Sequence, residues 1–289
     1  MALFAVYNGF WNAEPPETVR MLECAARRLG QTLTPIANTE WSVCVDGSAR
    51  VDGVQNGDTV LFFDKDVRLA NALVQMGVRV FNTPTSISVC DDKAATHLVL
   101  AAVNIPQPRT WIAPMTYTDV DARIYPFLAR AEASLGYPMV VKECYGSLGN
   151  QVYMAHDRTE LERLVFSMKE RAFLLQEYVE AGRQDKRLYV VNGRVAAAMR
   201  RHSEHDFRAN IGQGGHGEKY TPTAEEAALA VRCCEHLGLL FGGVDLLTDA
   251  CGNTVVCEVN SNAQTVEISR VTGVDIAEEI VLAALAKSQ

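Results

Sequence analysis

The sequence predicts an α/β protein with a parallel sheet in its N-terminal part and smaller lobes of mixed helices and strands after it. Up to residue 81, short apolar segments alternate with amphipathic helical segments, and this alternation favours a parallel sheet covered by helices. Beyond Pro106 and Pro108, neighbouring strands are instead joined by turn residues. With 289 residues, 48% of them hydrophobic and 21% charged, the chain can bury the cores of two or three small subdomains.

The first part begins with an apolar strand that lacks the basic lead and long apolar run of a signal peptide. Gly30 and Gly77 mark the ends of two helices, because glycine commonly follows the last helical turn. The expected elements are a strand at 3–7, a helix at 16–29, a strand at 59–63, a helix at 67–76, a strand at 78–81, a short helix opened by Thr83-Pro84 and a longer one from about 91 to 103.

The second part follows the proline-containing boundary at 106–108. Its expected elements are a helix at 124–135, paired strands at 139–142 and 152–155, a helix at 159–170, a strand at 173–179, strands at 187–191 and 194–200 that turn at Asn192-Gly193, a helix at 224–237, strands at 243–247 and 255–260, and a helix from about 276. We therefore expect an N-terminal α/β domain at 1–90, a small central lobe at 91–180 and a C-terminal lobe at 181–289.

Charge and cysteine content narrow the functional class. A net charge of -8 argues against a general nucleic-acid or acidic-membrane surface, although Arg194, Arg200, Arg201 and Arg208 could form a local basic patch. The sequence has no run of the roughly 18 apolar residues that a membrane span needs. Eight scattered cysteines without a C-x-x-C pair indicate a reduced, cytoplasmic protein.

A predicted hairpin near the C-terminus places oxygen ligands together. Its strands are Gly243-Val244-Asp245-Leu246-Leu247 and Val255-Val256-Cys257-Glu258-Val259-Asn260, separated by a turn at 248–253. Asp245, Glu258 and Asn260 would then lie close together, and two carboxylates with an amide suit Mg²⁺, with Mn²⁺ as an alternative. A polar hairpin with solvated acids fits the spacing equally well.

A second segment has the features of a phosphate-binding loop. An apolar strand ends at Lys142, a loop with Gly146, Ser147 and Gly149 follows, and a strand resumes near Val152. Glycines let the backbone N–H groups form an anion-binding concavity, and Lys142 would add a positive charge. A strand rather than a helix follows the loop, so this is neither of the common nucleotide fingerprints. By itself, such a loop is also compatible with a plain turn.

These segments together resemble the ATP-grasp superfamily, and within it the RimK-like carboxylate–amine (alpha-L-glutamate) ligases. The resemblance spans roughly residues 90–286, and the motifs occur in the family's order. They are Asp92-Lys93, Val141-Lys142 with the loop at 146–149, Gln176-Glu177-Tyr178-Val179, Asp185 to Val191, Asp206 to Asn210, Gly243 to Leu247, and Glu258-Val259-Asn260. The resemblance implies an ATP-grasp fold, in which the N-terminal α/β domain precedes a central and a C-terminal α+β lobe.

The resemblance also implies roles for individual residues. Lys93 and Lys142 are similar to the lysines that contact phosphate, and the loop of Gly146, Ser147 and Gly149 covers it. Gln176 is implied to belong to the nucleotide-binding residues, the hinge Glu177-Tyr178-Val179 to bind the adenine through backbone groups, and Asp185 to bind the ribose. The implied Mg²⁺ ligands are Asp245, Glu258 and Asn260, while Arg208 and Asn210 resemble the catalytic pair facing the γ-phosphate and the acyl phosphate.

The implied activity is ATP-dependent joining of a carboxylate, on a small molecule or a protein C-terminus, to the amine of an amino acid such as glutamate or of a peptide. The rival is a nucleotide-binding regulatory protein of the same fold that no longer turns over. After Asn260 the chain reads Ser261-Asn262-Ala263-Gln264 where many family members have Ser-Pro-Gly. The resemblance places this segment near the acceptor substrate, so glutamate specificity does not carry over directly. The sequence leaves open the two substrates, single or repeated addition, homo-oligomer formation, and whether the loop at 212–217 closes over the site.

Overall fold

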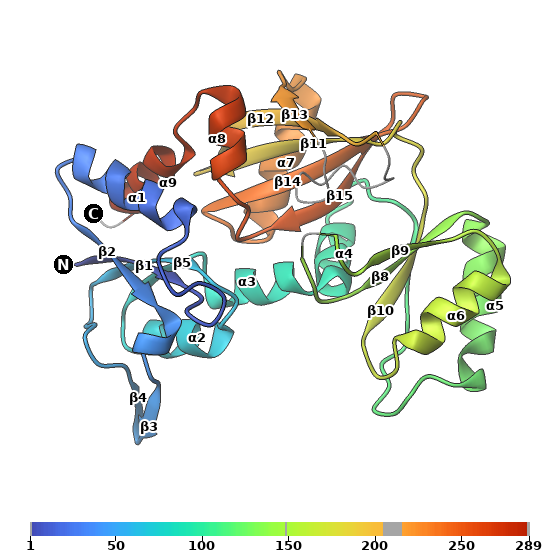
Figure 1. The fold of residues 1–289 in the computed structure, drawn as a ribbon, viewed down its shortest axis with the longest axis horizontal. Helices are drawn as coiled ribbons and strands as arrows, with labels where there is room; N and C mark the ends of the chain where they lie inside the picture. Colours follow the sequence, from blue (N-terminus) through green and yellow to red (C-terminus); the bar gives the residue numbers. More distant parts are fainter. Residues whose placement is uncertain (1, 148, 205–215, 288–289) are drawn as a thin grey trace.

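The computed structural model describes residues 2–147, 149–204 and 216–287 and contains three main sheets. In Figure 1 the N-terminal lobe and the central lobe lie at opposite ends of the molecule, and the third sheet lies between and above them. Within the described residues no helix is long and apolar enough to cross a membrane. All eight cysteines are free thiols.

The first sheet is parallel, as the β-α-β alternation predicts. Its strand order is β2-β1-β5-β6, with β1 (Leu3–Tyr7), β2 (Leu33–Ala37), β5 (Thr59–Phe63) and β6 (Arg79–Phe81). One face packs against α1 (Glu17–Arg28), and the other against α2 (Val67–Gln75). The short hairpin of β3 (Cys44–Asp46) and β4 (Ser48–Arg50) projects from this lobe (Figure 1). The one-turn helix η1 (Asn38–Glu40) follows β2 in the chain.

The second sheet is antiparallel and has its own core. Its order is β7-β10-β8-β9, with β7 (Thr110–Ile112), β8 (Met139–Glu143), β9 (Val152–Ala155) and β10 (Phe173–Glu177). Met139, Val141, Phe173 and Leu175 face the helices that cover one side, which are η2 (Ala122–Ile124), α5 (Tyr125–Leu135) and α6 (Arg158–Ser167). Since side chains alternate along a strand, Val140, Lys142, Leu174 and Gln176 are placed on the opposite side, away from these helices.

The third sheet carries the C-terminal half of the chain. Its order is β13-β12-β11-β14-β15, with β11 (Gln184–Val191), β12 (Arg194–His202), β13 (His216–Lys219), β14 (Phe241–Thr248) and β15 (Thr254–Asn260). One face packs on α7 (Ala224–His236) and α4 (Lys93–Ala102), and α3 (Pro84–Asp91) precedes α4. The other face packs on α8 (Val266–Thr272) and α9 (Ile276–Ala286). The expected paired strands are thus present.

The first and third sheets are joined by a shared core and by one buried asparagine. A single apolar cluster runs from α1 through α9 to Tyr189 and Phe241 of the third sheet. Asn82 donates to the carbonyl oxygens of Phe241 and Ser261 at 2.8 and 2.9 Å and accepts from the amide of Leu240 at 2.8 Å. This contact fixes the C-terminal end of β15 against the first lobe. The division of the chain at about residues 90 and 180 stays a prediction.

Candidate active site

A cleft lies between the second sheet, on its side away from α5 and α6, and the third sheet, which contributes residues of β11, β14 and β15. It encloses about 880 Å³ of empty space, its open mouth included, which is the size of a small-molecule site. Its lining includes these residues singled out from the sequence: Lys93, Lys142, Gly146, Ser147, Gly149, Gln176, Glu177, Tyr178, Val179, Asp185 and Glu258. The structure therefore brings together segments that are up to 165 residues apart, since Lys93 and Glu258 differ by that number (258 − 93).

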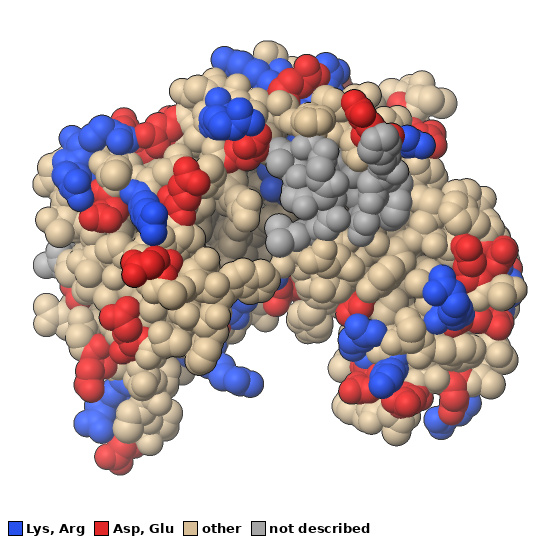
Figure 2. All heavy atoms as spheres, in the orientation of Figure 1, with Lys and Arg blue, Asp and Glu red and all other residues tan. Residues whose placement is uncertain are grey.

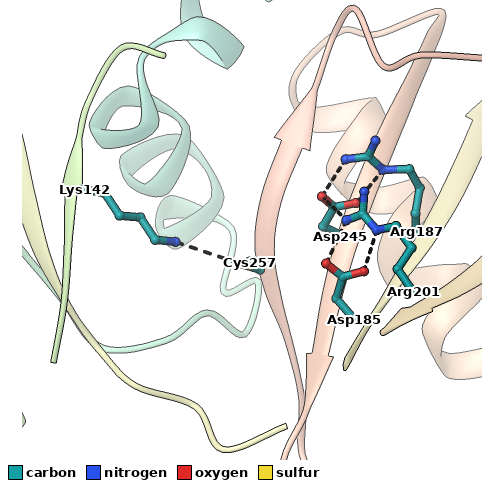
Figure 3. Close-up of polar contacts among 6 residues, drawn as sticks. All are labelled: Lys142, Asp185, Arg187, Arg201, Asp245 and Cys257. Carbon is teal, nitrogen blue, oxygen red and sulfur yellow. Dashed lines mark hydrogen bonds and ion pairs between the residues drawn. The ribbon is translucent and has the colours of Figure 1, made fainter. Parts of the chain in front are cut away.

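Two lysines face this cleft without an acidic partner. Lys142, on β8, is only 7% exposed, and its Nζ lies 3.8 Å from the Sγ of Cys257 (Figure 3). Nζ of Lys93 donates to the carbonyl oxygen of Gly146 at 3.2 Å. In the part of the chain that the structure describes, neither ammonium pairs with a carboxylate. Burial lowers the pKa of Lys93; Glu258 opposes this shift, and Lys142 adds to it. Buried positive charges that lack a partner indicate a site for an anion.

The start of α4 and the glycine loop hold each other in place. The backbone N–H of Lys93 donates to the carbonyl of Cys144 at 3.0 Å, and the hydroxyl of Tyr145 donates to Asp92 at 3.2 Å. Asp92 also caps α4 by accepting from two backbone N–H groups. Gly146 has a φ of 141°, and a Cβ there would lie 2.4 Å from the Gln151 side chain. Glycine is therefore required where the loop approaches the cleft.

The hinge after β10 lines the cleft, and the side chain of its first residue is held by Arg109. The carboxylate of Glu177 is occupied by Arg109, which donates from Nε and Nη2 at 3.1 and 2.9 Å and from its backbone N–H at 2.8 Å. Glu177, Tyr178 and Val179 all line the cleft. The binding of a base by the hinge, which the sequence resemblance implied, stays a prediction.

The predicted hairpin of β14 and β15 exists, with Asp245 directly opposite Glu258 and Gly243 opposite Asn260. The register shifts between Asp245 and Leu246, so Cys257 is the extra residue of a β-bulge. A bulge bends the strand and redirects side chains, and here both Cys257 and Glu258 line the cleft. Glu258 makes no hydrogen bond or ion pair within the described residues, and Nδ2 of Asn260 is buried without a partner.

Asp245 belongs to a buried charge network that the sequence reasoning missed (Figure 3). Arg187 donates from Nε and Nη2 to the two Asp245 oxygens at 2.7 and 2.6 Å. Arg201 donates to Asp245 at 2.9 Å and forms a bidentate pair with Asp185, both distances being 2.7 Å. Arg187 and Asp185 lie two residues apart on β11 and hence on one face. This two-residue spacing of an acid and an arginine on one strand was the signal in the sequence from which the network could have been inferred.

The network shifts its two acids in opposite directions. Burial raises the pKa of Asp245, but Arg187 and Arg201 outweigh it and bring that pKa down to about 2. Burial also raises the pKa of Asp185, and there it prevails over the opposing effect of Arg201. Asp245 is consequently the firmly ionised member.

These residues fit a magnesium ion that is completed by other ligands. Among the described residues Glu258 has no paired cation, and the side-chain oxygen of Asn260, not its buried donor Nδ2, is the atom that can bind a cation. Asp245 already accepts from two guanidinium groups, so it offers one remaining lone pair rather than a free carboxylate. Among the described residues, no group of three or more His, Cys, Asp or Glu side chains forms a metal site by itself. Mg²⁺ typically keeps waters or phosphate oxygens in such sites.

Other predicted residues fall elsewhere. Arg208, Asn210 and most of the loop at 212–217 lie outside the described residues. Three of the four arginines considered for a local basic patch do not form one. Arg201 is buried in the network, Arg200 pairs with Glu218 at 2.6 Å, and Arg194 pairs with Glu279. Figure 2 shows basic and acidic side chains interspersed over the visible face.

Replacing Arg201 by leucine is expected to destabilise the protein by about 3–5 kcal/mol, because Asp185 loses its cation and Asp245 loses one of two while both stay buried. Urea unfolding at pH 7 measures the free energy. The matched control is Arg123→Leu, which removes an exposed arginine paired with Asp121 and should leave the unfolding midpoint unchanged. An Arg201 variant as stable as the unaltered protein would show that the network contributes nothing.

The cleft thus lies between two antiparallel sheets and is lined by Lys93 and Lys142 and by the acids Asp185 and Glu258. Residues 90–284 match the family model described as the RimK-like ATP-grasp domain, and the chain belongs to that family. This match confirms the resemblance found over roughly residues 90–286.

Similar proteins support this assignment. "Uncharacterized protein MG012 homolog" of Mycoplasma pneumoniae is 31% identical over 273 residues, which are 92% of this chain and 93% of that protein. "Probable alpha-L-glutamate ligase" of Trichodesmium erythraeum is 36% identical over 210 residues, 71% of this chain and 67% of that protein. The solved ATP-grasp ligase PsnB, complexed with Mg, ADP and a precursor variant, superposes with a TM-score of 0.73 at 19% identity, over 100% of this chain and 99% of that one. At that identity the structural likeness shows the fold alone.

Proposed function

We propose that the protein is an ATP-dependent carboxylate–amine ligase that works through an acyl phosphate and releases ADP and phosphate. The observation that carries the proposal is the pair of cleft lysines, Lys93 and Lys142, which have no acidic partner among the described residues and face Glu258 across the cleft. Nucleotide phosphates would supply the missing negative charge. The similarity to a probable glutamate ligase supports the same reaction class.

The reaction needs positioning and charge neutralisation rather than a protein nucleophile. A carboxylate oxygen attacks the γ-phosphorus of ATP, the bond to the β-phosphate oxygen breaks, and ADP leaves with the electron pair. The amine nitrogen then attacks the carbonyl carbon, phosphate leaves, and the nitrogen loses a proton. Lys93 and Lys142 would balance the phosphate charge and the glycine loop would enclose it. Mg²⁺, held by Glu258, Asn260 and Asp245, would neutralise further phosphate charge.

The remaining predicted roles are part of this proposal. The hinge would hold the adenine through its backbone, and Asp185 would accept hydrogen bonds from the ribose hydroxyls. Arg208 and Asn210 would face the γ-phosphate. The eight free thiols agree with a reduced, cytoplasmic location, which we also propose.

For the amine we propose glutamate first, because the similarity to a probable alpha-L-glutamate ligase favours it. The acceptor side differs from the common family pattern at Asn262. Nδ2 of Asn262 donates to the carbonyl of Asp64 at 2.8 Å, so this segment meets the end of β5 in the first lobe. The carboxylate substrate would therefore contact the first lobe as well as the third sheet.

The experiment that tests the proposal is ADP release by the purified protein with MgATP and a panel of carboxylates, each with and without glutamate or another amine. Turnover that requires one carboxylate and one amine would establish ligase chemistry and name both substrates. Nucleotide binding without turnover across the panel would instead favour the rival, a nucleotide-binding regulatory protein.

We expect Asp185→Asn to raise the KM for ATP by about tenfold while kcat stays within about twofold, because ribose binding contributes equally to the ground and transition states. Initial rates at varied ATP measure both constants. Asp119→Asn, at an exposed acid in the loop after β7, is the control and should change neither. A fall in kcat with an unchanged KM would contradict the ribose role.

A further inference from the structure

A cluster of buried polar side chains lies behind Gln176 of the cleft. Gln176 is 2% exposed and His97, on α4, is 8% exposed. Nε2 of Gln176 lies 3.1 Å from Nε2 of His97 and donates to Oγ1 of Thr110 at 2.9 Å. On its other side, His97 is bonded through Nδ1 to Oε1 of Gln107. His97, Gln107 and Thr110 do not line the cleft themselves.

The hydrogen bonds of this cluster have only one consistent direction at the histidine. Nε2 of Gln107 donates to the backbone carbonyl of His97 at 3.1 Å, so its Oε1 is the atom that faces Nδ1. An amide oxygen only accepts, and Nδ1 must therefore carry the proton. Burial, assisted by Lys142, lowers the pKa of His97 to about 4, so the ring is neutral near pH 7. A neutral ring protonated at Nδ1 has a lone pair at Nε2, which accepts from Gln176.

Thr110 fixes the second hydrogen of the same amide. Its hydroxyl donates to the carbonyl of Pro108 at 2.8 Å, so toward Gln176 the oxygen accepts. Both N–H bonds of the Gln176 amide are then directed at acceptors, one at His97 and one at Thr110. Its carbonyl oxygen Oε1 makes no hydrogen bond with the described residues and belongs to a side chain that lines the cleft.

The position of Gln176 is that of the base rather than of the phosphates. On β10, Gln176 immediately precedes the hinge at 177–179 and pairs with Val140, whereas Leu174 pairs with Lys142. Two residues along a strand separate them by roughly 7 Å. The unused acceptor therefore lies next to the segment proposed to hold the purine.

We propose that His97 and Thr110 are positioning residues that hold Gln176 with its carbonyl oxygen toward the nucleotide, so that the cleft selects a purine with a 6-amino group over one with a 6-oxo group. The inference rests on the proposed function, because it assumes that the cleft binds a nucleotide. A 6-amino group donates to Oε1, whereas a 6-oxo group would place two acceptors against each other. Sites built around a hydrogen bond reject the analogue that lacks its partner.

The test is calorimetric binding of MgADP and MgIDP, which differ at position 6 and avoid turnover. We expect the unaltered protein to bind ADP at least about tenfold more tightly than IDP. His97→Leu removes one of the two acceptors that orient the Gln176 amide. The amide can then flip and donate to a 6-oxo group, so the ratio of the ADP affinity to the IDP affinity should fall toward one. His97→Gln, whose amide oxygen reaches about as far as Nε2 of the histidine, should restore most of the preference for ADP. Thr110→Val, which is nearly isosteric, should lower the ratio by about threefold and covers the case in which the His97 variant fails to fold.

The ratio separates the proposal from a role in stability alone, because a purely structural defect weakens both nucleotides equally. An ADP-to-IDP ratio unchanged in both Thr110→Val and a folded His97→Leu protein would overturn the inference while leaving the proposed function intact. An unaltered protein that binds the two nucleotides equally would overturn the inference in the same way. Failure of the unaltered protein to bind either nucleotide would overturn the proposed function as well.

Discussion

Replacing Lys142 by methionine is expected to lower ATP turnover by about 10³-fold, because the ammonium would stabilise charge that develops on the phosphates in the transition state. Methionine keeps most of the apolar stem, so the packing on β8 is retained. The folded protein should be at least as stable as the original, since a buried cation without an acidic partner among the described residues is removed. Initial rates of ADP release and thermal unfolding measure the two effects.

The combination of lost turnover and retained stability is what identifies a ligand-binding lysine. Lys287→Met, at the exposed end of α9, is the matched control and should change neither quantity. A Lys142 variant with near-normal turnover would contradict the assignment of the phosphate site. A variant with lower turnover and a much lower unfolding temperature would show instead that Lys142 serves the fold.

Glu258→Gln is expected to reduce turnover by about 10³-fold and to shift the magnesium requirement upward, because Glu258 is the carboxylate at the site that pairs with no cation among the described residues. Binding of ADP without metal should be unchanged or tighter, since the variant removes a negative charge facing the phosphates. Rates measured over a magnesium titration and metal-free ADP binding test these two effects separately.

Glu170→Gln, an exposed acid beyond α6, is the control for the loss of one carboxylate and should leave the magnesium titration unchanged. A Glu258 variant with the same magnesium dependence as the unaltered protein would exclude this residue as a metal ligand. Asp245 is the less informative position, because its replacement also breaks the pairs with Arg187 and Arg201.

The parts of the site that the sequence predicts well are set by local rules. The turn at 248–253 was enough to predict the hairpin that brings Asp245 near Glu258, and the glycines at 146 and 149 were enough to place a tight loop after Lys142. The direct pairing of Asp245 with Glu258 depends on the bulge at Cys257, because an unbroken register from the turn would pair Asp245 with Cys257. The parallel arrangement of the first sheet likewise follows from its β-α-β alternation.

The missed parts depend on contacts between distant segments. The short strands β2 and β7 contain few apolar alternations and form because a neighbouring strand offers hydrogen bonds. The pairing of Arg201 with both Asp185 and Asp245 needs the order of three strands, which no single segment specifies. The contact of His97 with Gln176 joins residues 79 positions apart. The roles of Arg208 and Asn210 stay predictions.

The distribution of apolar cores has a consequence for how the protein opens. The second sheet has a core formed only by residues 113–175, whereas the first and third sheets share one cluster and are further joined through Asn82. We therefore expect the protein to open as two units, with the cleft at the boundary between them. A nucleotide in the cleft would contact both units, and amide hydrogen exchange in β8 and β10 should slow as its concentration rises.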